Sequence, residues 1–145
     1  MIGIDTNLLV YAHRAGAAEH RAARAAIERA RDGLHGWGIP LPCIAEFLSV
    51  VTHPACSGGP SDARQAHAFL SGLIVQGQAA VWPPGGNFWE RFARAAADLG
   101  LRGARVFDLQ IALTAFDNGA TELWTHDRNF VSIPGLRVRD PLMAP

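Results

Sequence analysis

The sequence contains no lysine, and all 13 of its basic residues are arginines. They balance 13 acidic residues, so the formal net charge is zero. This balance excludes a uniformly basic surface that would attract nucleic acid through its overall field, so an RNA partner would need a local basic surface or a bound metal ion. The all-arginine usage fits bidentate phosphate binding, although a compositional bias explains it more simply.

Cysteines and long hydrophobic runs are also scarce. Cys43 and Cys56 are the two cysteines; they have no metal-binding spacing, and we expect two free thiols in an intracellular protein. The apolar stretches are interrupted by Glu46, proline or glycine, well short of the roughly 20 residues that a membrane span needs. The first five residues lack the basic region of a signal peptide. We therefore expect a cytoplasmic protein without a membrane partner.

Short apolar runs alternate along the chain with longer stretches of helical periodicity. The apolar runs predict strands at 2–4, 37–40, 79–82, 122–125 and 136–138. Patterns bounded by capping residues, glycine or proline predict helices at 8–11, 17–32, 43–53, 61–76, 87–99 (capped by Asn87) and 105–118. Alternation of strands and helices without hairpin signals predicts the α/β class, with a parallel sheet flanked by helices. No repeat or linker divides the chain, so we expect a single domain over residues 1–145.

Four acidic residues stand at positions that suggest a site. Asp5 directly follows the first predicted strand and Asp127 follows the strand at 122–125, so both should project from the carboxyl edge of the sheet, where such folds bind ligands. Glu46 and Asp108 lie in otherwise apolar helices. An acid in such surroundings is costly unless something pairs with it.

Each acid also has a structural explanation. Asp108 could favour a helix dipole, Asp5 and Asp127 could cap helices, and Glu46 could pair with a buried arginine. Together these require four coincidences, whereas one cluster explains all four residues. Clustered carboxylates repel one another, and Mg²⁺ or Mn²⁺ would relieve this repulsion through oxygen ligands. A site of this kind suits phosphodiester hydrolysis by metal-activated water. Zinc is not expected, because no set of His and Cys ligands is present.

Several neighbours could support the four acids. Thr6 and Asn7 could orient Asp5 or hold metal-bound water, although helix capping explains them equally well. Thr125 could bond a ligand or the phosphate, and the alternative is an ordinary strand residue. Arg102 and Arg105 are the best candidates for phosphate contacts. Asp117 is out of phase with Asp108 on its helix and should face away from the site.

At this point the sequence resembles the PIN-domain ribonucleases, specifically the VapC-type toxins of bacterial toxin–antitoxin pairs. The match rests on the order of these segments: Ile4-Asp5-Thr6-Asn7-Leu8-Leu9, Ala45-Glu46-Phe47, Val51-Thr52-His53-Pro54, Asp108-Leu109-Gln110-Ile111-Ala112, Leu123-Trp124-Thr125-His126-Asp127-Arg128-Asn129-Phe130 and Pro134-Gly135-Leu136-Arg137-Val138.

The resemblance implies a three-layer α/β/α sandwich with a short central parallel sheet. It also implies a type II toxin that cleaves structured RNA, often a transfer or ribosomal RNA, with Mg²⁺ or Mn²⁺ bound by the four acids. Family members usually form homodimers, and a VapB-type antitoxin silences them. Two departures stand out: Asn129 occupies a position where many relatives have a second Asp, and Phe107 and Leu109 flank Asp108 where relatives often have polar or small residues.

Two other functions compete with this one. Haloacid-dehalogenase-like phosphatases use an Asp after the first strand as a covalent nucleophile, but their second Asp would fall on Asn7, and no lysine can assist. A non-catalytic PIN-like module that binds RNA or protein is the stronger alternative, because Asn129 makes the site one negative charge poorer.

Overall fold

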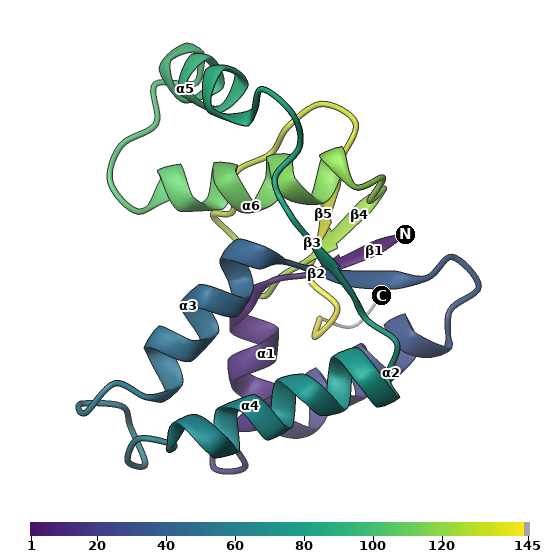
Figure 1. Ribbon diagram of the computed structural model, residues 1–145, viewed down its shortest axis with the longest axis vertical. Coiled ribbons are helices and arrows are strands. Elements are labelled where there is room, and N and C mark those ends of the chain that lie inside the picture. Colours follow the sequence, from purple (N-terminus) through teal and green to yellow (C-terminus); the bar gives the residue numbers. More distant parts are fainter. Residues whose placement is uncertain (144–145) are drawn as a thin grey trace.

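The computed structural model describes residues 1–143. Its strands and helices alternate along the chain as the sequence predicts (Figure 1). In order, the elements are β1 (Ile2–Ile4), α1 (Thr6–His13), α2 (His20–Asp32), β2 (Trp37–Pro40), α3 (Leu41–Val51), α4 (Ala63–Ser71), η1 (Gly72–Gln76), β3 (Ala80–Trp82), α5 (Phe88–Asp98), α6 (Arg105–Asp117), β4 (Glu122–Trp124) and β5 (Arg137–Arg139).

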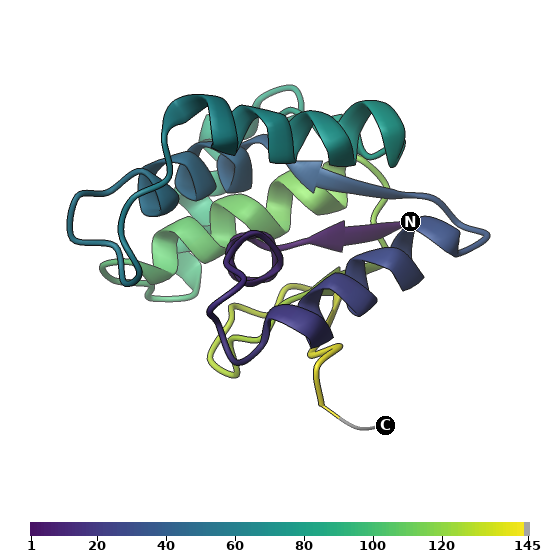
Figure 2. The ribbon, with the colours of Figure 1, turned by 90° about the horizontal axis from the view of Figure 1, so that it is seen from below.

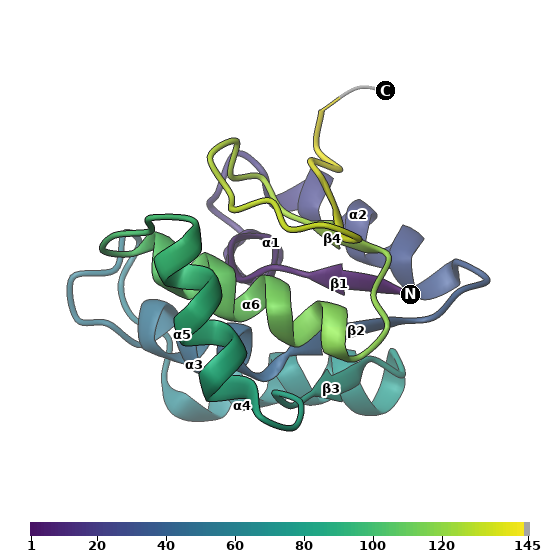
Figure 3. The same ribbon diagram turned by 90° about the horizontal axis from the view of Figure 1, so that it is seen from above.

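The strands form one sheet in the order β3-β2-β1-β4-β5, and every neighbouring pair is parallel. Helices α5 and α6 cover one face of this sheet, while α1, α2 and α4 lie on the other (Figures 1 and 3). The predicted α/β/α sandwich with a short parallel sheet is therefore confirmed. Strand order reverses direction at β1, so the carboxyl ends of β1 and β4 form the switch point where such sheets bind ligands.

Element boundaries depart from the sequence predictions at several helices. Helix α1 spans Thr6–His13 where 8–11 was predicted, and α3 spans Leu41–Val51 where 43–53 was predicted. The helix predicted from residue 17 begins at His20, because Ala17 and His20 donate main-chain hydrogen bonds that close two successive turns first. The pattern at 61–76 divides into α4, which begins with a capping box between Asp62 and Gln65, and the π-helical turn η1. Asn87 precedes α5 but does not cap it: its φ of 51° is left-handed, and its side chain makes no capping hydrogen bond.

The pairing of β2 with the edge strand β3 includes a close approach between a glycine and a tryptophan. The buried indole of Trp82, on β3, lies directly over Gly38 of the neighbouring strand β2. A Cβ on Gly38 would lie 2.7 Å from the indole Nε1 and closer still to two ring carbons. Only glycine leaves room for the ring here, and the packed sheet then holds the strand ends that carry the site.

Among residues 1–143, no helix is both long enough and apolar enough to cross a membrane.

Candidate active site

The parallel pairing of β1 with β4 brings two polar side chains together at the carboxyl edge of the sheet. Ile4 pairs with Trp124, so the next residue of each strand, Asp5 and Thr125, lies at the same edge. Strand β1 runs directly into helix α1, which is seen end-on in Figure 2. The Asp5 carboxylate accepts a 2.7 Å hydrogen bond from the main-chain N–H of Thr6 and so caps this helix. The capping role and a place at the sheet edge therefore coexist in one residue.

All four predicted acids line one cavity of about 270 Å³. Asp5 comes from the end of β1, Glu46 from the middle of α3, Asp108 from the first turn of α6 and Asp127 from the segment after β4. The remaining wall is formed by Thr6, Asn7, Val10, Tyr11, Val50 and Ile111. The cavity therefore combines four carboxylates with an apolar rim from α1, α3 and α6.

Asp5 is the most firmly held of the four acids, with a side chain only 5% exposed. Its Oδ2 accepts hydrogen bonds from the Thr125 hydroxyl at 2.6 Å and from the Asn7 amide at 3.1 Å. Its Oδ1 accepts from the Thr6 main chain and, at 3.8 Å, from the Cys43 thiol. Every contact is a donor to a carboxylate, an arrangement that fixes the orientation of the group.

Thr125 and Asn7 connect Asp5 to the segment that carries Asp127. The buried Thr125 hydroxyl donates to Asp5 and accepts from the Asn7 amide at 2.8 Å and from the Asp127 main-chain N–H at 3.0 Å. The Asn7 carbonyl oxygen in turn accepts from the His126 main-chain N–H at 3.1 Å. A hydroxyl has one donor and two acceptor positions, so Thr125 is fully used in this network.

Glu46 and Asp127 lie on the exposed side of the cavity. The expectation that Glu46 would be buried in its apolar helix is wrong, because the apolar residues Cys43 and Phe47 face the core while Glu46 points outward. Its Oε2 accepts a 2.6 Å hydrogen bond from the Thr6 hydroxyl. Asp127 accepts from the Asn129 main-chain N–H at 2.8 Å, which closes a tight turn rather than capping a helix.

The acids influence one another electrostatically. The pKa of Asp5 is raised to about 6, chiefly by burial and to a smaller extent by the charges of Glu46 and Asp108, against the opposing hydrogen bonds from Thr125 and Thr6. Burial also raises the pKa of Asp108 to about 6, with added repulsion from Asp127 and Glu46 and a smaller opposing effect of Arg105. Mutual repulsion of this kind is what a bound cation would relieve.

The chemistry of this donor set fits a hard divalent cation. All four side chains offer carboxylate oxygens, the ligands that Mg²⁺ and Mn²⁺ prefer. Within residues 1–143, no three His, Cys, Asp or Glu side chains are gathered closely enough to hold one ion by themselves. Mg²⁺ usually takes only one or two carboxylates directly and keeps several waters, so the wider spacing is compatible with such an ion.

The predicted phosphate contacts are placed unequally. Arg105 stands at the start of α6, where its charge acts on Asp108 and its guanidinium donates at 3.4 Å to the main-chain carbonyl of Asn129. Arg102 is exposed in the preceding loop and does not line the cavity. Asp117 points away from the site, as predicted, and pairs with Arg91.

The sequence reasoning missed two groups at the site. Cys43, interpreted only as a free thiol, lies behind Asp5 and donates to its carboxylate. The sequence carried no local signal for this position, because it follows from the packing of α3 against α1. Tyr11 lines the cavity, and its ring meets His126 edge-on at 6.1 Å. It follows Asn7 by four residues, so it lies one helical turn further along α1.

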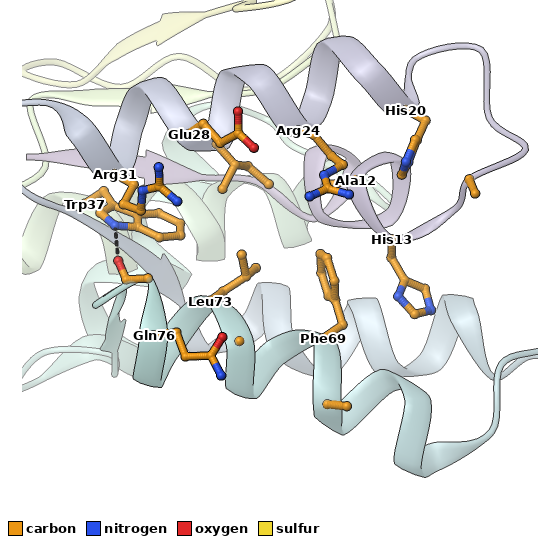
Figure 4. A pocket seen from close by; sticks show the side chains of 15 residues that line it. Ala12, His13, His20, Arg24, Glu28, Arg31, Trp37, Phe69, Leu73 and Gln76 are labelled. Atoms are coloured by element: carbon orange, nitrogen blue, oxygen red, sulfur yellow. Dashed lines mark hydrogen bonds between the residues drawn. The ribbon is translucent and has the colours of Figure 1, made fainter.

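A larger cavity of about 570 Å³ lies elsewhere, between α2 and the α4–η1 segment (Figure 4). Its floor is apolar, with Trp37, Phe69 and Leu73, and its rim carries Arg24 and Arg31. Glu28 is the only acid that lines it. We assign the candidate site to the smaller cavity because the four carboxylates converge there.

Comparisons with known proteins agree with this arrangement. The profile of the PIN domain matches residues 2–136. Ribonuclease VapC43 of Mycobacterium tuberculosis is 34% identical over 142 residues, which are 98% of this chain and 96% of that protein. The crystal structure of M. tuberculosis VapC20, described as a sarcin–ricin loop cleaving toxin, superposes with a TM-score of 0.68 at 15% identity over 90% of this chain and 92% of that one. VapBC-1 of nontypeable Haemophilus influenzae superposes with a TM-score of 0.64 at 20% identity over 99% and 100% of the two chains.

Proposed function

This chain belongs to the PIN-domain family, and from that premise we propose that it is a metal-dependent endoribonuclease, the toxin of a type II toxin–antitoxin pair. One observation supports this most strongly: acids from four separate segments of the chain line one cavity at the switch point of the sheet. Its relatives over nearly the whole chain are named as ribonucleases of the VapC group.

In this proposal Asp5, Glu46, Asp108 and Asp127 hold Mg²⁺ or Mn²⁺. The ion, when bound, would activate a water molecule for attack on the phosphodiester and neutralise charge that develops on the phosphate. The protein contributes preorganisation: Thr125, Asn7 and Thr6 hold Asp5 and Glu46 in fixed orientations before any ligand arrives. Carboxylates that are already oriented in this way lose less conformational freedom when the ion binds.

Arg105 is proposed to bind the RNA backbone beside the cleaved bond. Arg105 does not itself line the cavity, but it lies one helical turn before Asp108 and its charge acts on that acid; its guanidinium makes one long hydrogen bond, to the Asn129 carbonyl. Arg102 is proposed as an outer phosphate contact. Asn129 donates its main-chain N–H to Asp127 and so supports that acid without adding a charge.

Structured RNA is the proposed substrate, either a transfer or a ribosomal RNA, and the cytoplasm is the proposed place of action. The description of VapC20 as a sarcin–ricin loop cleaving toxin supports the ribosomal choice by analogy. A cognate VapB-type antitoxin is the proposed partner, since matching structures include a VapBC complex of Rickettsia felis and a FitAB complex. We also propose that the chain forms a homodimer.

The experiment is cleavage of total bacterial RNA by the purified chain, freed of antitoxin, in Mg²⁺, Mn²⁺ or EDTA. Discrete fragments should appear only with a divalent ion. They should disappear with Asp5→Asn and Asp108→Asn but persist with Asp117→Asn, which removes an acid outside the cavity. Intact RNA with a folded wild-type protein in both metals would refute the nuclease and favour a non-catalytic module that binds RNA or protein.

A further inference from the structure

Beside the carboxylate cavity lies a second hollow of about 350 Å³, between α3 and α6. It is lined by Pro42, Ala45, Glu46, Ser49, Phe107, Gln110 and Ile111. The residues from α3 recur every three or four positions, and so do those from α6, so each set forms one helix face. Two residues, Glu46 and Ile111, line both this hollow and the carboxylate cavity. The two spaces therefore adjoin each other at Glu46 and Ile111.

Phe107 is the most unusual member of this hollow. Its side chain is 62% exposed, although it directly precedes Asp108 in the first turn of α6. The residue on the other side of Asp108, Leu109, is fully buried. Packing in the core therefore accounts for Leu109 but not for Phe107. An aromatic ring held at the rim of an active site offers a flat face to a second aromatic group.

The polar groups of the hollow indicate what kind of ligand suits it. Gln110 carries an amide with donors and an acceptor, and Ser49 adds a hydroxyl. The Gln110 main-chain carbonyl is used inside the helix by Thr114 at 2.8 Å. Among the described residues, no arginine lines the hollow and the carboxylate of Glu46 does, so the local charge disfavours a phosphate group. A neutral, flat heterocycle suits this hollow, because its face can stack on the Phe107 ring and its edge can form hydrogen bonds with the Gln110 amide.

We propose that this hollow is a nucleobase subsite, in which an unstacked base of the RNA substrate stacks on Phe107 and bonds through its edge to Gln110. Single-stranded RNA is commonly recognised by stacking on aromatic side chains together with hydrogen bonds to the base edges. Because the hollow adjoins the carboxylate cavity, a base held here would belong to a nucleotide close to the cleaved bond. This inference rests on the proposed nuclease function and extends it to substrate selection.

A direct test uses the folded chain, phenylalanine labelled with ¹³C, and the four ribonucleoside 5′-monophosphates at millimolar concentration. The ring signals of Phe107 are identified by their loss in Phe107→Leu. At least one nucleotide should shift the Phe107 signals upfield and leave those of Phe116, an exposed phenylalanine of the same helix, in place. Absence of a Phe107 shift with all four nucleotides, or an equal shift with ribose 5-phosphate, would overturn the proposal.

Cleavage kinetics give a second readout for any RNA that the wild type cuts. Phe107→Leu should raise KM by about tenfold, within the range expected for loss of one base–aromatic stack, and change kcat much less. Phe107→Trp should restore KM, and the matched control Phe116→Leu should match the wild type. Equal impairment by Phe107→Leu and Phe107→Trp would refute stacking.

The two tests separate the possible failures. If nucleotides shift the Phe107 signals but the protein cuts no RNA, the proposed nuclease activity is refuted and the nucleobase subsite is supported. If the protein cuts RNA but nucleotides leave the Phe107 signals unchanged and Phe107→Leu leaves KM unchanged, only the nucleobase subsite is refuted. If Phe107→Leu instead converts a dimer into monomers in sedimentation experiments, with no nucleotide shifts, the hollow is an interface between two copies of the chain and the base-binding proposal is wrong.

Discussion

The hydroxyl of Thr125 donates a 2.6 Å hydrogen bond to Oδ2 of Asp5 across the end of the parallel pair β1 and β4. Both side chains are almost completely buried. The bond therefore links two strands that are 120 residues apart in sequence and fixes the carboxylate in the orientation that the cavity presents. The orientation of the Asp5 carboxylate and the stability of the sheet edge therefore depend on the same hydroxyl.

Replacing Thr125 by valine keeps the shape of the side chain and removes that hydroxyl. The Asn7 amide and the Asp127 main-chain N–H would lose their acceptor, and Asp5 would lose a donor. We expect a loss of about 1–3 kcal/mol in the free energy of unfolding, measured by urea denaturation, and strongly reduced RNA cleavage. Thr125→Ser should recover most of both.

Thr114→Val is the matched control for this substitution. Thr114 is equally buried, but its hydroxyl donates to the Gln110 carbonyl inside α6, and Thr114 does not line the cavity. It should leave cleavage near the wild-type rate. Loss of cleavage in both valine variants in proportion to their loss of stability would contradict a specific role of Thr125.

Binding of the divalent ion should depend on pH through the two acids with raised pKa values. Asp5 and Asp108 both titrate at about 6 without metal, and only ionised carboxylates bind the ion. We expect Mn²⁺ affinity, measured by calorimetry, to fall at least about tenfold from pH 7 to pH 5. Binding should release protons near pH 6 and few at pH 8. An affinity for Mn²⁺ that does not change between pH 7 and pH 5 would contradict the assignment of these two acids as ligands.

Much of the fold could be predicted from the sequence, because the signals were local. Apolar runs between capping residues predicted the strands, and the absence of hairpin turns predicted their parallel pairing. The failures came from competition between local structures. Asn87 is a residue type that often caps helices, but its backbone is left-handed and its side chain makes no capping hydrogen bond. The start of α2 moved to His20 because two turns formed first.

The candidate site was predicted residue by residue for its acids and only partly for their surroundings. Asp5 and Asp127 follow strands, so the topology of a parallel sheet predicts that both lie at its carboxyl edge. The outward direction of Glu46 could not be read from its apolar neighbours, because a helix with a buried face still has an exposed one. Cys43 behind Asp5 needed the packing of α3 against α1, which is long-range information.

Asp108→Asn should change the pH dependence of stability in the metal-free protein. The pKa of Asp108 is raised from 3.8 to about 6, so the folded protein bears a penalty for its charge above about pH 6, and this penalty vanishes toward pH 4. The difference in Tm between variant and wild type, both in EDTA, should therefore be more favourable to the variant at pH 7 than at pH 4. We expect about 2 °C, because solvent screens much of the interaction at this partly exposed carboxylate. Asp98→Asn, which alters an exposed acid of α5, provides the control. A difference that is independent of pH would mean that the pKa of Asp108 is not raised in the folded protein.

Gly38→Ala should destabilise the sheet without touching the site. The added methyl group would overlap the buried Trp82 indole, which cannot move without disturbing β3. Overpacking of this kind costs about 1–3 kcal/mol, measurable as a lower urea midpoint. Gly72→Ala is the matched control: that glycine has right-handed helical angles and open space around it, so alanine should stabilise the protein by about 0.4–1 kcal/mol. Equal stability of wild type and Gly38→Ala would mean that the indole can leave its place over Gly38, and that the close approach is not required for the fold.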